Sequence, residues 1–596
     1  MTDWQRDQRP RLGSYTLFAL CWVVFGLFLI WPVALVLAGA FSDVAPDGSR
    51  SFTWQHVAGV FVDPVVRDSI INSTLVAVVV TLLCVAASLP LALLTTRFDF
   101  AGKKILENLL LLPIILPPFV GAIGLRHLFG RFGGVNSLLT DVGIVDPANP
   151  IDFFGSARFW GVVITEALHL YPIVYLNLVA VMSNLDPALE QAAEVLGASR
   201  WMRFRRILWP LCLPGMFAGG TIVFIWSFTE LGTPLMFDFY RVGPVQIMWG
   251  VNDMAVSPRP YALVVVMLLC TLFLYFLGKY QFGRAAWTAP TRAMTTRTLK
   301  KLSGSTELLA MLPFALLIFL AVLPHLGVII ASFSPPGAWY RSTLPESATI
   351  AHYIGAAGNP LVSMSIRNSI LYSIIATLVD VVLGVAIAYL VVRAKPIGAK
   401  LLDAMAMMPL AIPGLVMAFG YVSMTLRWPL PQLSAYFDSI GWSSVAELFQ
   451  ITGRAPNPTL FLIIAYSIRR LPFIVRSASA GLEQVPVELE HAARNLGASS
   501  TVTLRRIVLP LILPSLIAGG LLTFSFAMLE VSDSLILAQA ETYFPITKAI
   551  YTLFKRLGDG PYIASALGVW SMALLGITLV GASMMLGRKL GALFRA

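Results

Sequence analysis

Charged residues are scarce in this chain. Asp, Glu, Lys and Arg make up 12% of its 596 residues, whereas a soluble protein carries about 25%. Hydrophobic residues make up 57%, and the mean hydropathy is +0.78. This composition excludes an ordinary soluble domain and predicts an integral membrane protein.

Cysteine clusters and catalytic motifs are also missing. The four Cys residues form no CxxC, so we interpret them as small buried hydrophobic residues and expect no metal site. No Gly-Lys pair is followed by Ser or Thr, which excludes the phosphate-binding loop of an ATPase. HExxH and GxSxG are absent as well. We therefore expect no catalytic residue and no cofactor in this chain.

Long apolar stretches dominate the sequence, and twelve of them can cross a hydrocarbon core of about 30 Å. Because the backbone must satisfy its own hydrogen bonds in lipid, they predict an all-α membrane protein. The first stretch, at 26 residues, is too long for a signal peptide. The predicted spans are 16–41, 70–96, 105–125, 159–182, 211–237, 261–278, 308–332, 368–392, 399–424, 459–479, 511–537 and 562–587.

The two halves of the chain repeat each other. Between 189–230 and 489–530, 20 of 42 positions are identical without a gap, where chance gives about three. Asn72-Ser73 recurs as Asn368-Ser369, and prolines of the third and fourth spans recur too. The sequence thus predicts two parallel six-helix repeats, 1–278 and 308–596, joined by a basic linker at 279–307.

The distribution of Lys and Arg predicts the orientation. If the N-terminus is cytoplasmic, the segments on that side hold 26 of the 42 basic residues and the opposite side holds 14. This bias follows the positive-inside rule and places both termini in the cytoplasm. It also accounts for the net charge of +11, so no nucleic-acid partner is needed.

Each repeat contains a polar loop, at 184–210 and 484–510, which we call the repeated loops. In the first loop Leu185, Leu189, Ala192 and Leu196 share one face of a helix. Gly197 is expected to end that helix in a left-handed turn, and Ser199 to cap a second helix. Two short helices hinged at a glycine predict a docking element for a cytoplasmic partner. The alternative is a solvated amphipathic connector, which near-identity of two copies disfavours.

The repeated loops resemble a known signature. The pattern Ala-Ala-x3-Gly-x9-Ile-x-Leu-Pro is similar to that of the permease subunits of binding-protein-dependent ABC importers. The chain departs from it where Gln191 and His491 replace the usual Glu, with a Glu one position earlier, and where Trp209 replaces Leu. The matching residues are Ala192, Ala193, Gly197, Ile207 and Pro210, then Ala492, Ala493, Gly497, Ile507, Leu509 and Pro510.

The resemblance implies the type I ABC importer permease fold, with each half similar to one six-helix permease of the bacterial inner membrane. It implies that the repeated loops couple to two copies of a cytoplasmic ATPase, which binds ATP and Mg. A periplasmic substrate-binding protein is implied on the other side. The residues expected to dock the ATPase are Glu190, Ala192, Ala193, Gly197, Arg205, Arg206, Glu490, Ala492, Ala493, Gly497, Arg505 and Arg506.

The substrate is only broadly defined by this resemblance. The chain is similar to the fused permeases of the ferric-iron, thiamine and 2-aminoethylphosphonate group. We expect ferric iron or a similar small ion or solute. Thiamine, 2-aminoethylphosphonate and polyamine remain alternatives.

Ionisable residues inside the predicted spans are candidates for the translocation pathway. Glu230 and Glu530 are equivalent, and helix-breaking residues follow both. We expect them to face each other across the pseudo-two-fold axis and to form an acidic constriction with Asp533. The alternative is that acids and arginines, with Asp380 among the acids, neutralise one another where the halves pack. The full set of pathway candidates is Glu166, His169, Glu230, Arg469, Arg470, Glu530 and Asp533.

Two other classes of protein fit the sequence less well. A secondary transporter of the major facilitator type also has twelve spans in two parallel halves, but it gives no reason for two matching cytoplasmic loops. A membrane-embedded enzyme would need clustered His or carboxylate motifs, which the loops lack.

Overall fold

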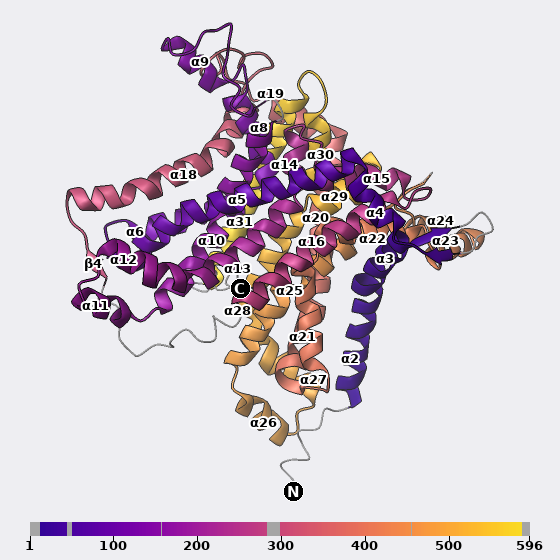
Figure 1. Cartoon of the computed structure of the whole chain (residues 1–596). Helices are drawn as coiled ribbons and strands as arrows, with labels where there is room; N and C mark the ends of the chain where they lie inside the picture. The colour runs from indigo at the N-terminus through magenta and orange to yellow at the C-terminus, as the bar shows by residue number, and fades with distance from the viewer. Residues whose placement is uncertain (1–11, 45–49, 156–157, 283–298, 454–455, 587–596) are drawn as a thin grey trace.

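The computed structural model describes residues 12–44, 50–155, 158–282, 299–453 and 456–586 as a helical bundle (Figure 1). Strands in these ranges are confined to two short pairs. β1 (Ser42–Val44) is antiparallel to β2 (Arg50–Phe52), and β3 (Phe98–Asp99) is parallel to β4 (Lys300–Lys301). Most of the predicted linker, 283–298, lies outside the described residues.

The first half contains one or more helices within each of its six predicted spans. Its helices are α2 (Leu12–Phe25), η1 (Gly26–Ile30), α3 (Trp31–Phe41), α4 (Gln55–Val62), α5 (Pro64–Arg97), α6 (Lys103–Leu109), α7 (Leu112–Ile115), α8 (Pro118–Phe129), α9 (Gly134–Asp141), α10 (Phe159–Asn184), α11 (Pro187–Val195), α12 (Arg200–Arg203), η2 (Phe204–Leu208), α13 (Trp209–Phe228), α14 (Gly232–Met236), α15 (Gly243–Gly250), η3 (Val251–Asp253) and α16 (Arg259–Phe282).

The second half repeats this order of helices. They are α18 (Ser305–Ser332), α19 (Ala351–Gly358), α20 (Pro360–Tyr389), η4 (Leu390–Ala394), α21 (Ala399–Met407), η5 (Met408–Leu410), α22 (Gly414–Thr425), α23 (Leu430–Ser439), α24 (Ser443–Glu447), α25 (Thr459–Gln484), α26 (Val487–Asn495), α27 (Ser500–Thr503), η6 (Leu504–Val508), α28 (Leu509–Met528), α29 (Ser532–Leu537), η7 (Glu541–Tyr543), α30 (Ile546–Phe554) and α31 (Gly560–Leu586).

Nine helices in the described ranges are long and apolar enough to cross a membrane, or eleven if each of two bent pairs is one span. The bent pairs are the predicted third and ninth spans, which turn by 95° and 100° at their breaks. Pro117 and Pro413 lie at these breaks, and proline cannot donate the hydrogen bond that would continue a helix. These two spans are therefore broken rather than straight.

The tenth predicted span lies in α25, which composition alone does not identify as a span. Every 18-residue window of α25 contains Arg469, Arg470 and Arg476. Its place in the fold is nevertheless that of α10. Helix α10 packs against α5 and α13, and α25 packs in the same way against α20 and α28.

The duplication extends to single hydrogen bonds. The Ser73 hydroxyl accepts from the backbone N–H of Gly243 at 2.9 Å, and the Ser369 hydroxyl accepts from that of Ile546 at 2.7 Å. These bonds attach the start of α15 to α5 and the start of α30 to α20. The Asn residues that precede these serines, Asn72 and Asn368, donate to backbone carbonyls just before α15 and α30. The acceptors are the carbonyls of Arg241 and Thr542. The repeat predicted from sequence is thus a repeat of structure.

The two halves exchange their first helices. The α2–α3 helix lies against the second half, where the Tyr421 hydroxyl donates to the carbonyl of Phe28 at 2.7 Å. Helix α18 lies against α8 of the first half. The crossing is so close that a Cβ added at Gly124 would lie 1.9 Å from the carbonyl oxygen of Pro324. Each half is therefore completed by a helix of the other.

Candidate docking loops and translocation pathway

The repeated loops fold as two short helices hinged at a glycine, as predicted. Helix α11 ends before Gly197, which has φ +81°, and α26 ends before Gly497, with φ +83°. In the first loop the Ser199 hydroxyl accepts from the N–H of Met202 at 3.2 Å and caps α12. Ser499 caps the second loop in the same way. In Figure 1 the first loop lies at the lower left, near the label α11, and the second lies at the bottom, near the label α26.

An acidic residue attaches each loop to the bundle. Glu190 accepts from the Arg97 guanidinium at 2.8 Å, and Glu490 accepts from Arg393 Nε at 2.7 Å. Arg393 also donates to the carbonyls of Leu482 and Val485. Both predicted Glu residues thus contact the chain itself and position the loop. Arg97 and Arg393 were not predicted, although their equivalent places at the ends of α5 and α20 could have revealed them.

The tips of the loops present apolar side chains to solvent. Leu196 is 86% exposed and Leu496 is 88% exposed. Val195 and Trp201 add to this surface in the first loop. Nothing lies within 4 Å of a Cβ added at Gly197 or Gly497, so the hinge itself is also free of the bundle. Exposed apolar residues at a hinge fit a surface that a partner covers.

The remaining predicted docking residues lie around the tips. Ala192 and Ala492 are exposed, and Ala193 and Ala493 are turned further toward the bundle. The four arginines are exposed on the π-helical turns η2 and η6, which occur at the same place in both loops. Turns of this kind are rare in proteins, and those that do occur are often found at functional sites. The arginines are Arg205, Arg206, Arg505 and Arg506.

The two loops differ in charge. In the first, Arg203 donates to Glu194 at 2.6 Å. In the second, Arg494 takes the place of Glu194 and lies 3.8 Å from Glu490, and Thr503 takes the place of Arg203. The two loops therefore offer a partner different surfaces on the same backbone.

In the membrane, Glu530 is bound by two arginines. Arg469 donates to it at 2.6 Å, Arg470 donates to its other oxygen, and Arg469 lies 3.5 Å from Asp533. Helix α25 brings these arginines in, because it packs along α28 and α29. The alternative drawn from the sequence, in which acids and arginines neutralise one another, describes the surroundings of Glu530, since a buried carboxylate is stable when it is paired.

Glu230 resembles Glu530 in its backbone partners, since Glu530 also accepts from the N–H groups of Ser532 and Asp533, but the two arginines bind Glu530. Glu230 accepts from the backbone N–H groups of Gly232 at 3.1 Å and Thr233 at 3.2 Å, at the start of α14. The two helix breaks meet across the halves, because a Cβ added at Gly232 would lie 2.8 Å from the side chain of Val531. The equivalent carboxylates thus follow the ends of α13 and α28, at two breaks that contact each other.

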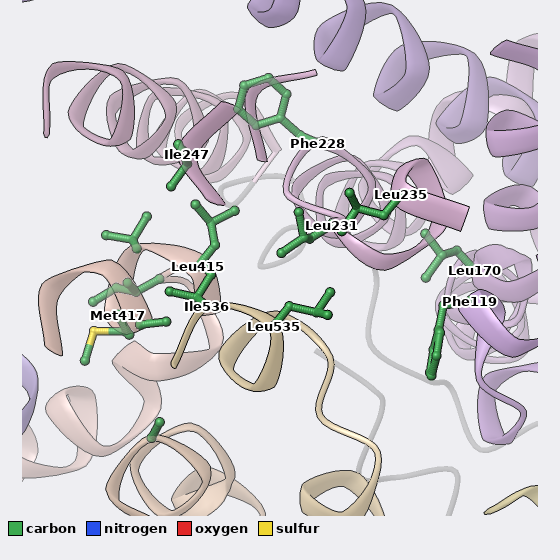
Figure 2. Packing of buried hydrophobic residues seen from close by; sticks show 14 of the residues in the cluster. Phe119, Leu170, Phe228, Leu231, Leu235, Ile247, Leu415, Met417, Leu535 and Ile536 are labelled. Atoms are coloured by element: carbon green, nitrogen blue, oxygen red, sulfur yellow. The ribbon is translucent and has the colours of Figure 1, made fainter. Parts of the chain in front are cut away.

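Apolar side chains close the space between these breaks. Leu231 and Leu235 from the first half and Leu535 and Ile536 from the second are fully buried in one cluster. Figure 2 shows Leu231 and Leu535 pointing toward each other, with Phe119 and Leu415 nearby. Apolar constrictions of this kind block ions and polar solutes. Sequence reasoning missed them, since a leucine within an apolar span carries no signal of its position.

The other intramembrane candidates are bonded within one half. Glu166 on α10 accepts from the Ser227 hydroxyl on α13, and Asp380 on α20 accepts from the Ser467 hydroxyl on α25. His169 Nδ1 lies 2.7 Å from the carbonyl of Pro113 beside the break of the third span. No cluster of three His, Cys, Asp or Glu that could hold a metal occurs in the part of the chain that the structure describes.

Comparison with known proteins gives matches along most of the chain. The family described as "Binding-protein-dependent transport system inner membrane component" matches residues 87–287 and 380–583. A putative ferric transport system permease protein of Haemophilus influenzae is 27% identical, over 86% of this chain and 76% of the relative. A ferric transport system permease protein of Actinobacillus pleuropneumoniae is 27% identical over 91% and 74%. The molybdenum transport system permease protein of Escherichia coli K12 is 34% identical over 28% and 71%.

Proposed function

This chain belongs to the family of binding-protein-dependent transport system inner membrane components, and we propose that it forms the entire translocation pathway of an importer of ferric iron. It is a multi-pass permease of an ABC importer. Its two family matches, one in each half, explain the two repeated loops, which a major-facilitator-type transporter would not. The importer family implies an ATPase partner and a substrate-binding protein.

The ATPase partner is proposed to bind at the two repeated loops, with one copy at each. The observation that carries this proposal is the pair of exposed leucines, Leu196 and Leu496, next to glycine hinges of the same geometry. ATP and Mg would be held by that partner. The loops, and with them both termini, then face the cytoplasm, in agreement with the positive-inside bias of Lys and Arg.

Ferric iron is proposed as cargo because two ferric permeases are similar to this chain over most of their own length. The molybdenum permease matches only 28% of this chain, which makes molybdate a weaker candidate. Thiamine, 2-aminoethylphosphonate and polyamine are alternatives within the same permease role.

The proposal is tested by reconstituting the chain with its ATPase in proteoliposomes and supplying the binding protein outside. Uptake of radioactive ferric iron should require ATP hydrolysis and the binding protein together. A matched preparation with an ATPase that binds but does not hydrolyse ATP is the control. Uptake of another candidate solute with no uptake of iron would refute the cargo. Failure of the binding protein to stimulate hydrolysis would refute the permease role.

A further inference from the structure

A cleft lies between the two halves at the end of the molecule opposite the repeated loops. Its volume is about 430 Å³, and it is lined by Arg126 at the end of α8, Asp238 after α14, and Phe554, Lys555 and Arg556 at the end of α30. In Figure 1 the labels α8, α14 and α30 lie in the upper part, away from α11 and α26. Under the proposed orientation this is the periplasmic face.

The cleft carries excess positive charge. One carboxylate, Asp238, is bound by Arg126 at 3.0 Å, by Arg158 and by Lys555. Burial alone would raise the pKa of Asp238. Hydrogen bonds from Lys555 and from the Tyr240 hydroxyl, with the nearby cations, lower that pKa to about 2. Three cations against one carboxylate leave two positive charges, and they come from both halves.

Arg556 is the cation of the cleft that is best placed for a new partner. It lies 3.2 Å from Glu541, and the side chains of the pair are 45% and 63% exposed. Exposed pairs of this kind contribute little to stability and are weakened by salt. An incoming carboxylate can therefore replace Glu541 at little cost.

This charge is found on one side of the pseudo-two-fold axis only. The equivalent bonds of Ser73 to Gly243 and of Ser369 to Ile546 align α15 with α30. In that register Lys555 and Arg556 correspond to Asn252 and Asp253. Asp238 follows α14 where Ala538 follows α29. A feature of the shared scaffold would recur in both halves, so the basic cleft is a specialisation of one of them.

We propose that this cleft receives an acidic surface segment of the periplasmic binding protein and sets the orientation in which that protein docks. The inference rests on the proposed function. A permease built from two similar halves offers two docking orientations related by half a turn. Charge complementarity on one side favours one orientation and disfavours the other. The occupant is a protein carboxylate, because the cleft is open at the face that the binding protein must cover.

The test measures docking on the complete complex of this chain and its ATPase in nanodiscs, with its own binding protein as the probe. Arg556→Glu should raise the apparent Kd about tenfold or more in low salt, and the difference should shrink in high salt as charges are screened. Arg556→Gln should give a smaller increase and Arg556→Lys none. The matched control is Arg427→Glu, a charge reversal beside the outer end of α22, the counterpart of α8.

Two results would overturn the proposal. The first is an unchanged Kd for Arg556→Glu, and the second is an equal loss for Arg427→Glu. If the Kd is unchanged and uptake is reduced, the cleft contacts cargo rather than partner. Stimulation of ATP hydrolysis by the binding protein is first measured on the unaltered complex. Its absence would count against the proposed function, whereas the Kd of Arg556→Glu decides the docking proposal in either case.

Discussion

Glu230 and Glu530 occupy equivalent positions in the two repeats, yet their surroundings give them different tasks. Each accepts two backbone N–H groups of the helix that follows it, and two arginines from α25 bind Glu530 in addition. The position equivalent to Arg469 in the first half is His169, which instead contacts the break of the third span. Equivalence in sequence therefore identifies the helix breaks but not the charge balance around them.

Replacing these two residues by Gln should separate their roles. Glu530→Gln removes the carboxylate that Arg470 binds and leaves Arg469 with Asp533 alone, so we expect it to destabilise the fold by about 3–5 kcal/mol. Glu230→Gln keeps a side-chain acceptor for the backbone N–H groups and should leave stability nearly unchanged. Thermal unfolding of the two purified variants measures the difference. Equal stability of both would contradict this account of Glu530. Uptake per folded molecule of Glu230→Gln then shows whether the residue lines the path.

The hinge glycines should respond to substitution through backbone conformation alone. Gly197 and Gly497 have positive φ and open space around an added Cβ. A change to Val therefore costs about 1 kcal/mol or more at the hinge without a clash in the bundle. We expect Gly197→Val with Gly497→Val to leave the bundle folded and to abolish stimulation of ATP hydrolysis by the binding protein. Full stimulation in the doubly changed complex would show that the hinge geometry is not needed for coupling.

At the scale of helices, local signals were readable from the sequence and packing partners were not. The glycine, the capping Ser199 and the helical spacing of Leu189 and Leu196 are local, so the form of the repeated loops was predictable. The exchange of α2–α3 and α18 depends on which apolar surfaces meet, and periodicity does not contain that choice. The pairing of Arg97 with Glu190 is a contact between distant residues, so no local signal predicts it. It could still have been found from the repeat, because both residues recur at equivalent places in the second half.

The exchanged helices make one glycine a sensitive test of assembly. Gly124→Val would place a Cβ against backbone atoms of α18, the Pro324 oxygen at 1.9 Å and the Val328 nitrogen at 2.6 Å. Backbone atoms cannot turn aside, so we expect a loss of more than about 3 kcal/mol and poor recovery of monodisperse protein. Gly576→Val in α31 is the matched control, since nothing lies within 4 Å of its added Cβ. Normal thermal stability of Gly124→Val would refute the close crossing of α8 and α18.

Considered as a whole, the molecule contains both halves of a pathway and both repeated loops in one chain. The halves share a backbone plan down to the Ser73 and Ser369 hydrogen bonds. They differ in the charges around Glu230 and Glu530, at the loop tips, and in the cleft at the opposite end. A single chain can hold such differences because each half evolves separately, which a symmetric pair of identical subunits cannot do. The scaffold is therefore symmetric and its surfaces are not.

We propose that one copy of this chain forms both halves of the permease and carries two ATPase subunits. Native mass spectrometry of the complex, purified through a tag on this chain, tests it most directly. The account predicts one chain of 64.9 kDa with two ATPase copies, and loss of both copies when Leu196 and Leu496 are changed to Asp. A complex that contains two copies of this chain, or ATPase binding that survives both changes, would contradict it.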